Sequence, residues 1–275
     1  MTNPRRLDAL FGALMLGFAA LVLLQIPFSG SLFYTKIYAG KTVVVFGSIV
    51  RIAALAVAWW FVRRGVAQFE AGNPARPAWR FLEWGLGGYC IAQVALSGMN
   101  VFMADGAPFP SVADALFLIS TLLLFLGVVG FVRAYSVVGY LASSRNQTIV
   151  VGVAAAVVLC IVNWKALAPI VQADLPAAET FFNCAYPIID SLVAVASIAL
   201  LRVTLSFLGG RLWRVWLALL MGFLFMAAGD IVYAYEFSLD MQNLNPVTDW
   251  LFTWGYLLLA RGAIDNFQLT GGEGN

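Results

Sequence analysis

The sequence PFPSVAD, Pro108–Asp114, leads into an apolar run over Ala115–Val132, and the rest of the chain is organised around it. A proline-rich turn here places a carboxylate in the first turn of a helix of membrane-spanning length, since a bilayer core of about 30 Å needs roughly 20 apolar residues. Proline followed by aspartate recurs at Pro187–Asp190 and at Pro246–Asp249. The recurrence predicts several membrane-length helices with acids near one end.

The composition is that of an integral membrane protein. Hydrophobic residues make up 62% of the 275-residue chain and charged residues only 11%, so most of the surface must face lipid. The apolar runs are continuous and do not alternate, which favours helices over a β-barrel. We therefore expect one all-α membrane domain over residues 1–275, a bundle of eight transmembrane helices. Their predicted ranges are about 9–28, 41–62, 79–103, 111–135, 147–168, 187–207, 213–236 and 246–267.

Two of these segments have a second interpretation. The first run resembles a secretory signal peptide, but no convincing cleavage triplet follows it, so we interpret it as a helix. The stretch Ala177–Tyr186 either lies at the membrane interface or extends the sixth helix outward past Pro187. The sequence pattern does not decide between these two.

Charged residues are distributed unevenly between the two ends of the predicted bundle. With eight spans, one side collects twelve arginines and the other only three lysines. Basic residues concentrate on the cytoplasmic side of membrane proteins, so both termini are predicted to be cytoplasmic. The acids have the opposite bias, with nine outside and five inside, and the rule for basic residues does not explain that excess.

The third and fourth predicted helices resemble the seventh and eighth, with spacings that agree within about two residues. The matched residues are Trp84, Gly88, Gln93 and Asp114 in the first pair and Trp216, Gly222, Asp230 and Asp249 in the second. One interpretation is a parallel repeat of two four-helix halves, and the other is chance. Interfaces between repeats are common binding sites in membrane proteins.

Several kinds of chemistry have no residues to support them. The chain has no histidine, which excludes imidazole metal ligation and histidine acid–base catalysis. Cys90, Cys160 and Cys184 lie far apart in the sequence and are interpreted as small buried apolar residues. No serine, cysteine or lysine has an identifiable activating base. We therefore predict no catalytic site, no cofactor, no resident metal and no nucleic-acid partner.

Ionisable residues within spans are costly unless they face a partner or water. Arg51, Asp190 and Asp230 are the residues concerned, and at 1.5 Å per residue Arg51 lies roughly 15 Å deep and Asp230 roughly 9 Å. One interpretation is that Arg51 bridges to Asp190 or Asp230 and fixes the helix packing. The others are that it contacts a ligand or extends to the membrane surface.

The acids near helix starts also have two interpretations. Ser111 with Asp114 forms a capping box, and Asn245 with Pro246 is a good helix start, so separate caps would explain each acid singly. The alternative is a shared outward-facing acidic pocket for a small cation, whether a divalent metal ion or an organic amine, or for proton sensing. The predicted ligand-binding residues are Arg51, Asn100, Asp114, Tyr186, Asp190, Asp230, Tyr233 and Asp249.

Five short motifs together resemble a known family. They are WRFL at Trp79–Leu82, PFPSVAD, YPIID at Tyr186–Asp190, AGDIVY at Ala228–Tyr233 and WGY at Trp254–Tyr256. In this order they resemble the multispanning sensory domain found N-terminal to bacterial diguanylate cyclases, cyclic-di-GMP phosphodiesterases and histidine kinases. The resemblance covers about Arg76–Ala263.

This resemblance implies a non-catalytic sensor of the bacterial inner membrane that binds a ligand at its outer face. Relatives tend to carry an acid where this chain has Gln93, and they continue into a cytoplasmic signalling domain where this chain stops at Asn275. We therefore expect the membrane input module alone, which acts through a partner protein.

Two other functions stay open. A small-solute or cation transporter would need a second, inward-facing access path, and Arg51 near mid-depth favours it. A structural subunit of a larger membrane complex would use the acids only as helix caps and would bury one face against another protein.

Overall fold

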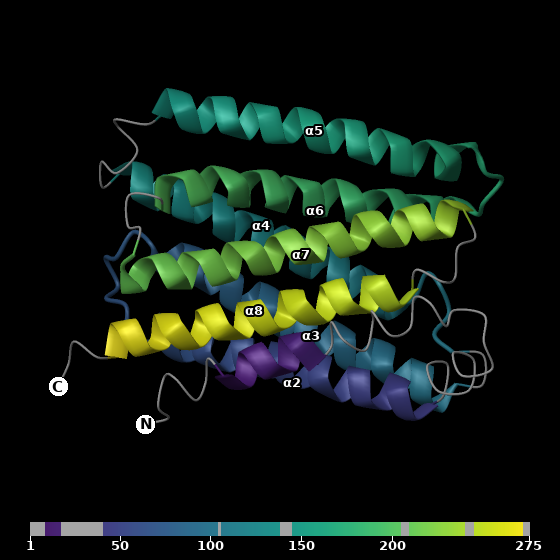
Figure 1. Cartoon of the computed structure of the whole chain (residues 1–275), viewed down its shortest axis with the longest axis horizontal. Coiled ribbons are helices and arrows are strands. Elements are labelled where there is room, and N and C mark those ends of the chain that lie inside the picture. Colours follow the sequence, from purple (N-terminus) through teal and green to yellow (C-terminus); the bar gives the residue numbers. More distant parts are fainter. Residues whose placement is uncertain are drawn as a thin grey trace.

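A computed structural model describes residues 9–17, 41–103, 106–137, 145–204, 209–239 and 245–271, and within these ranges the chain is helical without strands. Seven long helices of this part run side by side along one direction (Figure 1). They are α2 (Lys41–Val66), α3 (Arg76–Phe102), α4 (Val112–Val137), α5 (Arg145–Gln172), α6 (Ala177–Thr204), α7 (Arg211–Leu239) and α8 (Asn245–Gly271). The predicted all-α class is confirmed.

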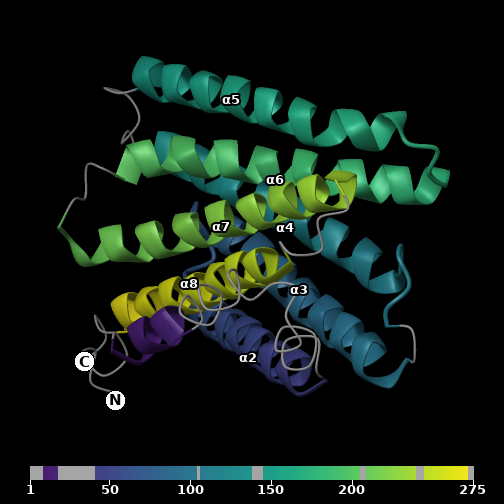
Figure 2. The ribbon, with the colours of Figure 1, turned by 45° about the vertical axis from the view of Figure 1, so that its right-hand side comes forward.

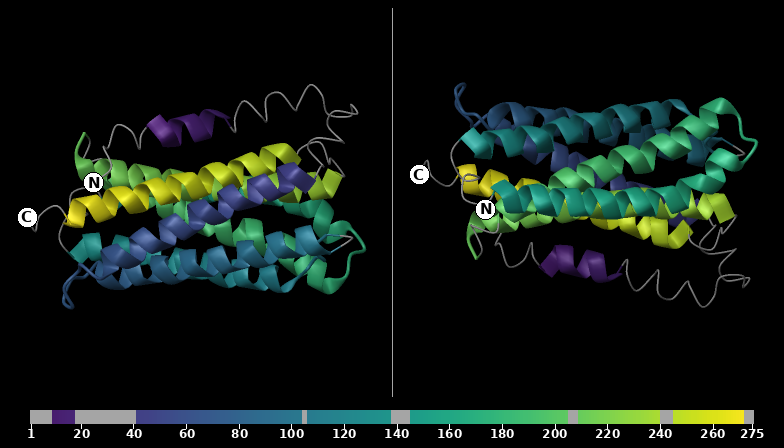
Figure 3. Two further views of the ribbon diagram at one scale, coloured as in Figure 1. Left: turned by 90° about the horizontal axis from the view of Figure 1, so that it is seen from below. Right: turned by 90° about the horizontal axis from the view of Figure 1, so that it is seen from above.

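A short helix at residues 9–17 lies outside the main bundle, beside α8 (Figure 3). The indole Nε1 of Trp254 donates a hydrogen bond of 3.0 Å to the main-chain oxygen of Met15, and Phe11 and Leu14 pack against the core. The rest of the predicted first helix, residues 18–28, lies outside the described residues.

Five helices, α2, α4, α5, α6 and α7, are long and apolar enough to cross a membrane, which indicates a multi-pass membrane protein. The two others differ in composition. The α3 helix is rich in glycine, and α8 carries Asp249, Arg261 and Asp265 along its length. At 1.5 Å per residue, helices of 26 to 29 residues span about 39 to 44 Å.

The sixth helix begins at Ala177, ten residues before the predicted range 187–207, so the stretch Ala177–Tyr186 extends this helix past Pro187, which is the second of its two interpretations. Proline is tolerated inside α6 because neighbouring helices can satisfy the freed main-chain groups of a membrane helix. Asp190 therefore lies roughly four turns inside α6 and not in a first turn. The described start of α4 agrees with its prediction, with Asp114 in the first turn.

The helices pack in a definite order around the bundle. The α3 helix packs along α4, and α7 packs along α8. The α2 helix contacts α3 and α8, whereas α6 contacts α7 and α4. The α5 helix lies at the edge of the bundle (Figure 2) and packs on α6 and α7, so most of its apolar surface is left for lipid.

Glycines allow the paired helices to approach closely. A Cβ atom at Gly85 of α3 would come within 2.6 Å of Leu124 on α4, and one at Gly222 of α7 would come within 2.9 Å of Leu259 on α8. In the α3–α4 pair and in the α7–α8 pair, a neighbouring contact has the reverse arrangement, with a glycine of α4 or α8 against a leucine of α3 or α7. These contacts are Gly127 with Leu82 and Gly262 with Leu219.

An aromatic cluster fills the core between the two pairs. The Trp79 ring centroid lies 6.0 Å from that of Trp216, and both rings pack against Phe131. The internal repeat predicted from the sequence matches Trp216 with Trp84. The structure differs, because Trp84 is 54% exposed and Trp216 only 2%. The α3 tryptophan that resembles Trp216 in burial and contacts is Trp79, five residues before Trp84.

Candidate functional site

Two acids from neighbouring helices meet in the interior of the bundle. Asp190 on α6 and Asp230 on α7 are 3% and 9% exposed, and their carboxyl groups are hydrogen-bonded to each other. Asp190 Oδ2 is buried and has no hydrogen-bond partner among the described residues. Since an ionised carboxylate only accepts hydrogen bonds, the bond between the two requires one proton.

Asp190 belongs to a row of buried polar side chains on α6. Asn183, Asp190 and Ser197 are seven residues apart, so they share one face of the helix, and we call them the α6 polar row. Asn183 is 2% exposed and Ser197 is fully buried. Asn183 Nδ2, Asn183 Oδ1 and Ser197 Oγ have no partner in the described part of the chain. Buried polar groups without partners are uncommon and call for an explanation.

Asp114 connects α4 to α6. The Tyr186 hydroxyl donates to the main-chain oxygen of Asp114 at 2.7 Å and lies 3.2 Å from its Oδ1. Asp114 Oδ2 accepts hydrogen bonds from the Ser111 main-chain nitrogen and from its hydroxyl, both at 2.6 Å. One carboxylate therefore caps α4 and also contacts a residue of the neighbouring helix.

Arg51 forms an ion pair with Asp249, which connects α2 to α8. The predicted partners of Arg51 were Asp190 or Asp230, and the sequence missed Asp249 because α2 packs along α8, a neighbour that periodicity cannot identify. The side chain of Arg51 is 14% exposed and that of Asp249 is 50% exposed, so the pair lies partly in solvent or headgroups.

The two remaining predicted residues are Asn100 and Tyr233. Asn100, near the end of α3, is exposed, and its Oδ1 accepts a hydrogen bond of 2.9 Å from the main-chain nitrogen of Ala107, so it stabilises the following turn. Tyr233 on α7 is 36% exposed. The eight predicted residues thus divide into three contacts between helices and two residues near the surface.

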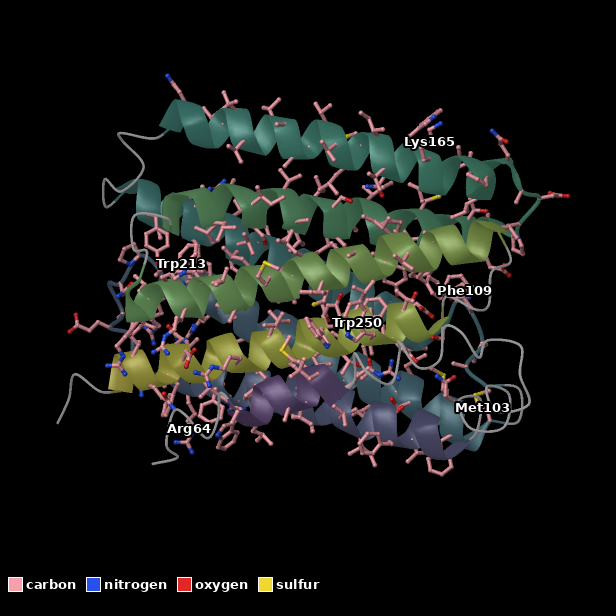
Figure 4. The ribbon with its side chains drawn as sticks, viewed as in Figure 1. Arg64, Met103, Phe109, Lys165, Trp213 and Trp250 are labelled. Carbon is pink, nitrogen blue, oxygen red and sulfur yellow. The ribbon has the colours of Figure 1, made fainter. Side chains whose placement is uncertain are left out.

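Both ends of the bundle can be followed in Figure 4. Met103 and Phe109 lie at the end where α4, α6 and α8 begin, and Arg64 and Trp213 lie at the opposite end. Asp114 and Asp249 lie near the first of these ends, which we call the acidic end. The other end carries exposed arginines such as Arg211 and Arg214, and we call it the arginine end.

Sequence reasoning missed two tyrosines in this region. The Tyr89 hydroxyl on α3 lies 2.7 Å from the Thr121 hydroxyl on α4, and the Tyr89 ring centroid is 6.1 Å from that of Tyr256 on α8. Both tyrosines interact electrostatically with Asp190 and Asp230. No sequence signal singled them out, because tyrosine is common near membrane interfaces. The seven-residue spacing could have revealed Asn183 and Ser197.

The chemistry that this arrangement supports is binding of protons or cations. Carboxyl and hydroxyl oxygens gather where α3, α6, α7 and α8 meet. Among the described residues no three His, Cys, Asp or Glu side chains are grouped in a way that could hold a metal ion.

Comparisons with known proteins add no identity. No family model, no curated protein and no solved structure matches the chain.

Proposed function

We propose that this protein is a non-catalytic, receptor-like module of a bacterial inner membrane that binds a small cationic ligand at its buried acids and acts through a partner protein. The observation that carries the proposal is the hydrogen bond between Asp190 and Asp230 in the interior, where one carboxyl oxygen has no partner. A buried polar group that serves packing alone is normally satisfied by its neighbours. A group left unsatisfied inside a membrane protein is a candidate for function.

Eight spans with both termini in the cytoplasm are part of the proposal. The arginine end and the acidic end lie at opposite ends of the bundle, as expected for a protein inserted with its arginines inside. With this orientation, Asp114 and Asp249 face the periplasm. A ligand would then approach from the side on which the acids gather.

An internal parallel repeat is the second part of the proposal. The α3 and α7 helices share Trp, Leu and Gly at matched spacing, and α4 and α8 share Asp, Phe, Leu and Gly. These sets are Trp79, Leu82 and Gly85 with Trp216, Leu219 and Gly222, and Asp114, Phe117, Leu124 and Gly127 with Asp249, Phe252, Leu259 and Gly262. The α2 helix packs on α3 and α8 as α6 packs on α7 and α4, which supports an equivalence of α2 with α6.

The repeat makes the acid pair a feature of one half only. When the Arg51–Asp249 contact is matched with the Tyr186–Asp114 contact, Leu55 of α2 corresponds to Asp190. The Trp-Leu-Gly register matches Gln93 of α3 with Asp230. Leu55 and Gln93 are both buried. Because one half packs with leucine and glutamine at these places, the fold itself has no need of two carboxyl groups there.

The test is a thermal unfolding series of the purified full chain in detergent. The series covers pH, divalent cations and organic amines, with Asp190→Asn and Asp230→Asn in parallel. Binding at the pair predicts a shift of the unfolding temperature with one ligand that both variants lose. Affinity capture with the full chain as bait tests for the partner. A structural subunit predicts no ligand response, and that result would refute the receptor proposal.

A cation transporter is the second candidate, and the α6 polar row favours it. At 1.5 Å per residue the row extends about 21 Å along α6, which is most of the thickness of a bilayer core. Uptake of a cation or proton into proteoliposomes, abolished by Ser197→Ala at the inner end of the row, would support transport. Ligand-dependent stabilisation without any flux would support the receptor-like function and contradict the transporter.

A further inference from the structure

We infer that the ligand of the Asp190–Asp230 pair is a proton, and that Asn183 connects the pair to the acidic end of the bundle. This inference rests on the proposed function and names its ligand.

The contact between the two carboxyl groups suits a proton better than a larger cation. The side chains are joined directly to each other. A divalent metal ion between them would require six or more oxygen ligands for Ca²⁺ at about 2.3 to 2.6 Å. An organic ammonium group would require the side chains to separate. A shared proton needs neither change.

The ion pairs that the structure shows do not include Asp190 or Asp230, and Arg51 acts electrostatically on Tyr256 beside the pair. Arg51 is the basic residue in the interior, and it forms its ion pair with Asp249 on the α2–α8 side. Arg211 and Arg214 lie at the start of α7, at the arginine end. With both carboxyl groups ionised, two like charges would therefore be in contact in an apolar core, which is strongly unfavourable.

The groups that face the pair from the surrounding helices are hydroxyls and one further acid. Tyr89 of α3, Tyr186 of α6 and Tyr256 of α8 interact with it. Asp114 of α4 is linked to the acid pair through Tyr186, whose hydroxyl donates a hydrogen bond to the main-chain oxygen of Asp114. From α5, Asn163 donates to the Ser191 hydroxyl at 2.6 Å. These groups can hydrogen-bond a neutral carboxylic acid, but none brings the positive charge that a second ionised carboxylate would need.

Asn183 is the independent observation that points to exchange with the outside. It is 2% exposed, and neither its Nδ2 nor its Oδ1 has a partner. It lies seven residues from Asp190 toward the acidic end, about 10 Å along the same face of α6. Between them, Pro187 has no N–H, so the main-chain oxygen of Asn183 lacks its helical donor. The side-chain amide and the main-chain oxygen of Asn183 thus both lack protein partners, and a bound water, which makes two to four hydrogen bonds, suits such groups.

The step is a simple transfer. A hydronium ion at the acidic end gives up its proton, which passes through water at Asn183 to the ionised carboxylate of the pair, and neutral water remains. The reverse step leaves two adjacent carboxylates, and their repulsion separates α6 from α7. The signal is therefore a change in the packing of α6.

Infrared difference spectroscopy on the full chain in lipid nanodiscs tests this inference. We expect the wild type to show the C=O band of one protonated carboxylic acid per chain at neutral pH and to lose it in alkaline buffer. The double variant Asp190→Leu/Asp230→Gln copies the other half of the bundle, so it should fold and should lack the band. Asp174→Asn, at an exposed position, is the matched control and should keep it. Asn183→Leu should slow the loss of the band after a pH jump at least tenfold.

Three outcomes would overturn the inference. They are a wild type without the band, a double variant that retains it, and a band that does not change with pH, which would make the proton a fixed structural element. The proposed function fails separately. If Na⁺, Ca²⁺ or tetramethylammonium at constant pH stabilises the wild type but not the double variant, the receptor stands and the proton is the wrong ligand.

Discussion

Replacing one acid of the Asp190–Asp230 pair should destabilise the protein more than replacing both. Asp230→Gln alone leaves Asp190 in its apolar site beside a new neutral side chain, and Asp190→Leu alone leaves Asp230 without its carboxyl partner. An unsatisfied buried polar group costs about 1 to 3 kcal/mol, and more if it is charged. The double variant removes both groups together, and replacement of a buried polar pair by groups that pack well is close to neutral.

The expected coupling energy between the two substitutions is therefore about 1 to 3 kcal/mol, with the double variant more stable than the sum of the single ones predicts. The assay is a double-mutant cycle on the full chain, with the free energy of unfolding measured by denaturant titration in mixed micelles at neutral pH. Additive effects within about 0.5 kcal/mol would show that the two side chains do not share a proton or a hydrogen bond. That result would refute the reasoning on which the proposed site rests.

Three further predictions test the packing and the orientation. Tyr186→Phe removes the hydrogen bond between α6 and Asp114 and should lower the free energy of unfolding by about 0.5 to 1.5 kcal/mol, measured by the same titration. Gly222→Ala places a Cβ 3.0 Å from a main-chain oxygen of α8 and should cost about 1 to 3 kcal/mol; Gly98→Ala, with open space around it, should cost nothing, and equal effects would contradict the glycine contacts. In a chain without its native cysteines, Ala107→Cys should react with an impermeant maleimide on intact spheroplasts and Arg80→Cys only after lysis. The opposite labelling would reverse the orientation.

The sequence predicted the helical class and most helix positions because composition and helix length depend on local residues alone. The capping box at Ser111 and Asp114 was also predictable, since a cap is a contact between near neighbours in the chain. The start of α6 was not predictable. Proline ends helices in water, but Pro187 lies inside a helix whose neighbours can satisfy its backbone.

The partners of the interior residues depend on the order of helices around the bundle, which periodicity does not contain. Arg51 reaches Asp249 because α2 packs along α8. Trp79 and Trp216, which resemble residues of an interfacial belt, are buried in the core because glycine contacts bring their helices together. The sequence did indicate that Asp190 and Asp230 need partners, because an isolated ionisable residue inside a span is costly, but the partner that it suggested was Arg51.

The proline of α6 separates two attachments of that helix to different neighbours. On its outer side Tyr186 is bonded to α4, and on its inner side Asp190 is bonded to α7. A bend at Pro187 can therefore release the inner half of α6 while the outer half stays fixed to α4. The α5 helix, which lies against α6 at the rim, would tilt with that inner half toward the arginine end. A change at the acidic end would in this way displace two helices at the arginine end.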